Sequence, residues 1–105
     1  MKGYQLTFFT QQGRMVEKVP LADWLILQAS ELEIHGATVT TGVQGVGHDG
    51  KAHTTNLFDI SDQPVQITFI VDEQQAARLV ERLDGSGAED VFFVRSIVEF
   101  GRVGA

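Results

Sequence analysis

The stretch VQITFIVDEQQAARLVERLDG, residues 65–85, decides the fold of this chain. Every second residue from Val65 to Val71 is apolar, and this period of two predicts a β-strand. Asp72, followed three residues later by Gln75, is a capping-box signature and predicts the start of a helix. Apolar residues then recur at helical spacing until Gly85, which ends the helix; they are Ala76, Leu79, Val80 and Leu83.

The first half of the chain repeats this order of elements. Residues 3–10 alternate like a strand, and Pro20 suits the first turn of a helix that carries an apolar stripe. Gly36 lies just past the end of that helix, where we expect a left-handed residue to close it. A second strand is predicted over 37–43, and a fourth strand follows the second helix over 91–98.

Two β-α-β halves predict an α+β fold, the ferredoxin-like βαββαβ sandwich. Right-handed crossovers place both helices on one face of a four-stranded antiparallel sheet. A different strand order on the same elements is also compatible with the pattern. A chain of 105 residues buries roughly two thirds of its surface on folding, enough for one core, so we expect a single domain over 1–105.

The sheet face without helices is expected to be apolar. An apolar patch on an open sheet is typical of a surface that associates with another molecule. The connection at about 44–62 is also unusually long, because connections in compact domains are typically about 4–6 residues and longer ones are usually functional or disordered. The residues expected on the open face are Phe9, Ile70, Phe92, Val94 and Val98.

Charge and composition limit the function. The chain has 14 acidic and 8 basic residues, a formal net charge of −6, and its basic residues are scattered. Binding a nucleic-acid backbone requires a basic face, so we expect no nucleic-acid polymer as partner. The absence of cysteine excludes disulfides and thiolate metal sites. No apolar run is long enough to span a membrane and no secretory signal is visible, so we expect a cytoplasmic protein.

The glycine-rich stretch GVQGVGHDGKA, residues 42–52, fits the residue spacing of two phosphate-binding motifs but lacks their structural context. Gly-x-Gly-x-x-Gly at 45–50 fits the dinucleotide fingerprint, but no helical pattern follows it. The same glycines with Lys51 nearly fit a P-loop, but Ala52 stands where a Ser or Thr would hold magnesium. Two interpretations remain open: converging backbone amides that bind an anion, and a simple hairpin end.

The segment 43–47 also resembles the phosphate-binding segment of acylphosphatases, which share the ferredoxin-like fold. In that family the segment continues with Phe-Arg, whereas here His48 and Asp49 follow, and a carboxylate repels the anion that the arginine attracts. The segment also follows the second predicted strand and not the first. We therefore expect no enzyme, and keep an acylphosphatase-like phosphohydrolase as an alternative.

Several segments, in this order and spacing, resemble the uncharacterised PII-like proteins of the family called Domain of Unknown Function one-ninety. The resemblance covers essentially residues 2–102. The segments that carry it are Lys2-Gly3-Tyr4-Gln5-Leu6, Ile34-His35-Gly36-Ala37-Thr38-Val39, Gly45-Val46-Gly47, His53-Thr54, Asp62-Gln63-Pro64-Val65 and Val71-Asp72.

The resemblance implies a ferredoxin-like protomer assembled as a homotrimer, with the open sheet faces packed together. Relatives of this kind bind nucleotides in clefts between subunits. Their long loop, here about 44–62, reorganises with the ligand and contacts partner proteins, often membrane transporters. The implied function is that of a signalling regulator whose effector is an adenine nucleotide: AMP, ADP, ATP or a cyclic form.

The resemblance also implies the site residues. This sequence departs from PII proteins in two places. Asp49 stands where those proteins have glutamine, and the second turn lacks the expected Thr and Lys. ATP with magnesium is therefore not favoured over a smaller nucleotide. The implied nucleotide-binding residues are Gly45, Val46 and Gly47 at the loop base, His53, the second turn Gly85, Ser86 and Gly87, and the basic residues Arg95 and Arg102.

Metal binding is the remaining alternative. His35, His48 and His53 are possible ligands, since imidazole commonly binds metals. His48 and His53 are five residues apart and have no third ligand at a known spacing, so the sequence favours no metal and no required cofactor. A metal-binding or purely structural trimer of the CutA type stays open as an alternative.

Overall fold

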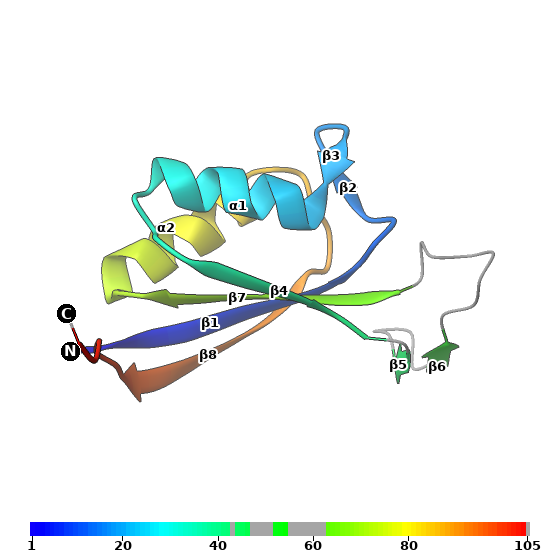
Figure 1. Ribbon diagram of the computed structural model, residues 1–105. Helices are drawn as coiled ribbons and strands as arrows, with labels where there is room; N and C mark the ends of the chain where they lie inside the picture. The colour runs from blue at the N-terminus through cyan, green and yellow to red at the C-terminus, as the bar shows by residue number, and fades with distance from the viewer. Residues whose placement is uncertain (43, 47–51, 55–62, 105) are drawn as a thin grey trace.

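The computed structural model describes residues 1–42, 44–46, 52–54 and 63–104. It has two layers, a sheet and a pair of helices on one of its faces (Figure 1). The sheet contains β1 (Lys2–Gln11), β4 (Ala37–Thr41), β7 (Pro64–Val71) and β8 (Phe92–Glu99), in the order β4-β7-β1-β8 with antiparallel neighbours. The ferredoxin-like prediction is confirmed, with β1 and β7 at the centre.

The strand bounds differ little from the predicted ones. β4 ends at Thr41 and not at residue 43, and Val43 lies outside the described residues. The register places Leu6 opposite Phe69 and Phe8 opposite Ile67. Because side chains alternate between faces, these four apolar residues all point to the same side of the sheet.

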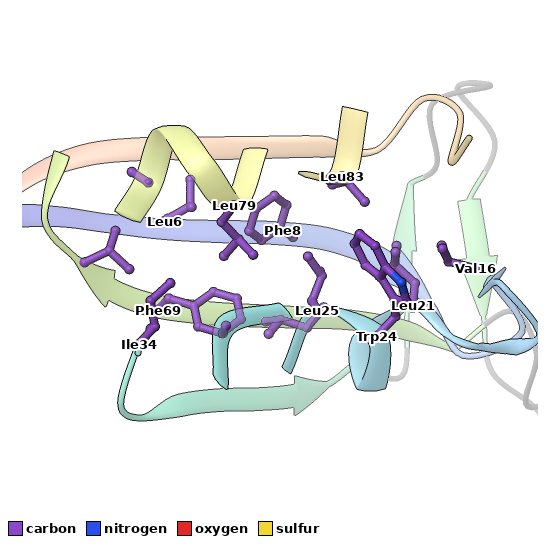
Figure 2. Packing of buried hydrophobic residues seen from close by; sticks show 14 of the residues in the cluster. Leu6, Phe8, Val16, Leu21, Trp24, Leu25, Ile34, Phe69, Leu79 and Leu83 are labelled. Carbon is purple, nitrogen blue, oxygen red and sulfur yellow. The ribbon is translucent and has the colours of Figure 1, made fainter. Parts of the chain in front are cut away.

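That side is covered by α1 (Leu21–Glu31) and α2 (Glu73–Asp84). The helices insert Leu21, Leu25 and Leu79 between themselves and the central strands, where these side chains are fully buried. Figure 2 shows how the side chains from the strands and both helices point toward one another. Trp24 also lies in this core.

The start of α2 has the predicted capping box. The Asp72 side chain accepts a hydrogen bond from the backbone N–H of Gln75 at 2.7 Å, and the Gln75 side chain accepts one from the backbone N–H of Asp72 at 3.0 Å. Two backbone donors that the helix itself cannot satisfy are thereby paired. The helix ends at Asp84, directly before Gly85, as predicted.

The predicted closure of α1 by Gly36 is wrong. The helix ends at Glu31, and the left-handed residue that follows is Glu33, with φ of 60°. The N–H groups of Glu33 and Ile34 donate to the carbonyls of Ser30 and Ala29, at 3.1 and 2.9 Å. This pair of bonds is a Schellman motif, which satisfies the last carbonyls and buries Ile34 against the core. Gly36 does have a positive φ, but it lies in the turn into β4.

The structure has two short hairpins outside the main sheet; the first was not predicted, and the second agrees with the hairpin interpretation left open for residues 42–52. The first pairs β2 (Met15–Val16) with β3 (Val19–Pro20), so Pro20 directly precedes α1 and is not in its first turn. Its turn residues, Glu17 and Lys18, both have positive φ, a geometry that normally selects Asn or Gly. The second hairpin pairs β5 (Gln44–Val46) with β6 (Ala52–Thr54), inside the long connection.

The open face of the sheet carries the apolar residues predicted for it. Phe9 lies opposite Phe92, with ring centroids 5.6 Å apart, and Thr7 lies opposite Val94. Phe92 is 65% exposed, and Val94 and Ile70 are also exposed, while Phe9 and Val98 are half-buried. Thr7 and Thr68 share a hydrogen bond of 3.0 Å at the centre of this face.

Candidate functional site

Gly45 and Val46, the first two residues of the first glycine segment, belong to β5 of the β5–β6 hairpin. Gly45 lies directly opposite His53, and Val46 lies opposite Ala52. The hairpin base is tied to the main sheet, because the N–H of Gly42 donates to the carbonyl of Pro64 at 2.8 Å. Gly47 lies outside the described residues, as do most residues of the 44–62 loop. The hairpin brings together two predicted site residues, Gly45 and His53, at the level of the backbone.

The second glycine segment, Gly85-Ser86-Gly87, forms a compact turn after α2. The Ser86 hydroxyl donates to the carbonyl of Leu83 at 2.6 Å and accepts from the N–H of Ala88 at 3.2 Å. The serine therefore shapes the turn. Gly87 has φ of +86°, a conformation that residues with a side chain rarely adopt.

Both glycine segments lie at the same end of the sheet. α2 starts after Val71, which is opposite Tyr4 near the beginning of β1, and runs back toward the end of β1. The hairpin follows β4, whose last residue Thr41 is opposite Val65 at that same end. Figure 1 shows the β5–β6 hairpin extending beyond this edge. The fold thus places the two glycine-containing segments, 40 residues apart from Gly45 to Gly85, at the same end of the sheet.

Arg95 lies in the middle of β8, opposite Leu6, on the face that carries the helices. Its guanidinium is exposed and lies over the ring of Tyr4, with Cζ 4.9 Å from the ring centroid. The stacked geometry leaves the N–H groups at the edge of the guanidinium plane free to bind an anion, since they donate to no described residue.

Arg102 is not brought near the glycine turns of its own subunit. β8 ends opposite Lys2, and the tail is held beside the N-terminus, where the N–H of Phe100 donates to the carbonyl of Met1 at 2.8 Å. This is the opposite end of the sheet from the hairpin (Figure 1). A cleft that contains both Arg102 and a glycine turn therefore requires a second subunit.

A groove that the sequence did not predict lies between α2 and the beginning of β8. Its volume is about 460 Å³, and it adjoins the Gly85–Gly87 turn. The only sequence signal is a row of small and acidic residues along one side of α2. The residues that line the groove are Ala77, Val80, Glu81, Leu83, Asp84, Ala88, Asp90, Val91 and Phe93.

The histidines considered as metal ligands do not form a metal centre among residues 1–42, 44–46, 52–54 and 63–104. These ranges contain no group of three or more His, Asp or Glu residues placed to hold a metal ion. His35 is exposed after α1, and His48 lies outside the described residues. In the described part of the chain, no helix is long and apolar enough to cross a membrane.

The model of the family DUF190, described as Uncharacterized ACR, matches residues 3–98. The chain belongs to the DUF190 family. A UPF0166 protein of Aquifex aeolicus (strain VF5) is 30% identical to this chain over 81 residues, which cover 76% of this chain and 77% of the relative.

Solved structures resemble this DUF190 protein in fold. CPII, a nitrogen regulatory PII-like protein from Thiomonas intermedia K12 bound to ADP, AMP and bicarbonate, has a TM-score of 0.73 at 17% identity, covering 97% of this chain and 91% of CPII. A PII-like protein from Thermus thermophilus has a TM-score of 0.64 at 20% identity, covering 93% of this chain and 87% of that protein. At this identity the likeness establishes the PII-like fold and not the ligand.

Proposed function

We propose that this DUF190 protein is a PII-like regulator that binds an adenine nucleotide at clefts between subunits and acts on a partner protein through the 44–62 loop. The observation that carries the proposal is the placement of Gly45 and the Gly85–Gly87 turn at one end of a PII-like sheet. Backbone N–H groups of glycine-rich turns can converge on phosphate without a Cβ in the way.

The charges of the described residues support the same ligand class. Arg95 presents unused N–H donors, and Arg102 is exposed on a tail at the other end of the protomer. In an assembly of several copies, the tail of one subunit can approach the glycine turns of the next. The net charge of −6 makes a small phosphorylated ligand more suitable than a polyanion, because a few local donors suffice to hold it.

Assembly is expected to use the open face of the sheet. Phe92 and Val94 are exposed there beside Phe9, and Ile70 is exposed farther along the same face, although soluble monomers rarely leave large apolar surface in contact with water. We propose a homotrimer in which three such faces pack together. Sedimentation of the wild type and of Val94→Lys tests this, since a buried lysine should dissociate the trimer. The control, Ser30→Lys, places a lysine at an exposed position of α1, on the helix layer and away from the open face.

Calorimetry against AMP, ADP, ATP and cyclic AMP tests ligand binding, with bicarbonate present in a second series because the CPII structure contains it. We expect at least one nucleotide to bind with a dissociation constant below about 1 mM, equivalent to about −4 kcal/mol. Absence of binding by all four at that concentration contradicts the proposal.

The same samples test the absence of catalysis. Chromatography of each nucleotide after incubation, and an acyl phosphate hydrolysis assay, should show no turnover. Hydrolysis that disappears in a Gln44→Ala variant would favour the acylphosphatase-like alternative, because that residue belongs to the segment that resembles the acylphosphatase motif.

A further inference from the structure

The groove between α2 and β8 combines an apolar floor with an acidic rim. Val80, Leu83 and Phe93 contribute apolar surface, and the side chains of Glu81 and Asp84 stand beside them on α2. These two carboxylates form no hydrogen bond or ion pair with any described residue. Among the described residues, none that lines the groove is basic. Arg14 reaches the neighbourhood, but its Nη1 donates to the backbone carbonyl of Asp90 at 3.3 Å.

The tail after β8 has the complementary chemistry. Reciprocal bonds between Met1 and Phe100, at 2.9 and 2.8 Å, fix where the tail leaves the sheet. Beyond this point Arg102 and Val103 are exposed, and the side chain of Val103 is fully accessible. A basic and an apolar side chain are thus adjacent on a projecting segment, and they match the acidic rim and apolar floor of the groove.

The tail cannot reach the groove of its own subunit. Phe93 lies in the groove, and β8 continues for six residues to Glu99, a distance of roughly 20 Å at about 3.3 Å per residue. Arg102 is only three residues further, so even a fully extended return covers only about 11 Å. The complementary segment must therefore come from another copy of the chain.

We propose that the groove between α2 and β8 receives the tail of a second copy, with Arg102 pairing with Glu81 and Asp84 and Val103 lying against Val80 and Phe93. Phe93, which lines the groove from β8, is itself 40% exposed, so the apolar floor is accessible to another copy. The contact requires no nucleotide, and it goes beyond the proposed function by assigning a specific subunit contact.

A charge swap tests the contact in nucleotide-free protein by sedimentation equilibrium. Arg102→Glu and Asp84→Arg should each raise the dissociation constant of the assembly by about tenfold, because each places like charges together. The double variant, Arg102→Glu with Asp84→Arg, should return it to within about threefold of wild type. Lys18→Glu, the same change of charge in the β2–β3 turn, is the matched control and should have no effect.

Cross-linking gives a second measurement, which the cysteine-free chain makes clean. A mixture of Val103→Cys and Ala88→Cys proteins should form a mixed disulfide under mild oxidation, because Ala88 lines the groove. Val103→Cys mixed with Ser30→Cys, on the exposed side of α1, should not.

The proposal is wrong if the wild type is monomeric or if Arg102→Glu leaves the dissociation constant unchanged. It is also wrong if the double variant shows no recovery or if no mixed disulfide forms. Calorimetry on the wild type separates it from the proposed function. A wild type that assembles and shows the charge-swap recovery, but binds no nucleotide, would contradict only the proposed function.

Discussion

The guanidinium of Arg95 lies over the ring of Tyr4, with Cζ 4.9 Å from the ring centroid, although the two residues are 91 positions apart in sequence. Adjacent strands bring them together, because β1 and β8 pair along their length and both side chains point to the helix-bearing face. The ring fixes one face of the guanidinium and leaves its edge donors accessible. Tyr4 therefore orients a candidate anion-binding group.

Replacing Tyr4 tests this orientation. Tyr4→Leu removes the aromatic face, and an exposed cation–π contact is worth about 0.5–1 kcal/mol, so we expect nucleotide affinity to fall about two- to fivefold. Tyr4→Phe keeps the face and should bind like wild type in the same calorimetric titration. Equal affinity in all three proteins would show that the stack does not serve the ligand.

The second glycine turn offers a matched pair of substitutions. Gly87→Ala places a Cβ on a residue with φ of +86° and should cost about 1–2 kcal/mol. Gly85 has φ of −79°, and a Cβ added there would make only ordinary van der Waals contacts, with the carbonyl oxygens of Glu81 at 3.5 Å and Arg82 at 3.8 Å. Gly85→Ala should therefore be neutral or stabilising by up to about 1 kcal/mol. Urea unfolding compares the two variants, and equal stabilities would contradict the turn geometry.

Gly3 is required for close packing between the central strands. A Cβ added there would overlap the carbonyl oxygen of Val71, a backbone atom that cannot move without displacing β7. We expect Gly3→Ala to lower the free energy of unfolding by about 2–3 kcal/mol, typical of overpacking in a core. In Gly101→Ala the added Cβ meets no atom within 4 Å, so this control should unfold like wild type.

Thr10 should tolerate loss of its hydroxyl. Its Oγ1 is buried without a hydrogen-bond partner among the described residues, an arrangement that costs free energy. Thr10→Val should therefore be stabilising by about 1 kcal/mol. Thr7→Val, which loses the 3.0 Å bond to Thr68, should instead be destabilising by about 1 kcal/mol. Thermal unfolding distinguishes the two, and a destabilised Thr10→Val would indicate an unrecognised partner.

The parts of the fold that follow from local pattern could be predicted. A period of two assigns Phe9, Phe92 and Val94 to one face of any sheet that contains their strands, and the paired strands do place them together. The Asp72–Gln75 capping box acts over three residues, so its sequence signature is complete in itself.

The glutamates with positive φ could not be predicted, because distant contacts override the preference of glutamate for negative φ. Glu33 closes α1 while its carbonyl accepts a hydrogen bond from Gln75 Nε2 at 3.4 Å. Glu17 has φ of 51° in its turn and accepts a hydrogen bond from Trp24 Nε1 at 3.3 Å. Glutamate carries no turn signal, so Gly36 was a reasonable prediction and a wrong one.

The order of strands and helices, their apolar faces and the absence of thiol chemistry were determined by the amino-acid sequence alone, since each depends on residue type or on spacing within one element. The tertiary structure decided the rest: the Arg95–Tyr4 stack, the groove beside α2, and the separation of Arg102 from the glycine turns of its own subunit. These features join segments far apart in the chain, and only the packing of strands and helices sets the distances between such segments.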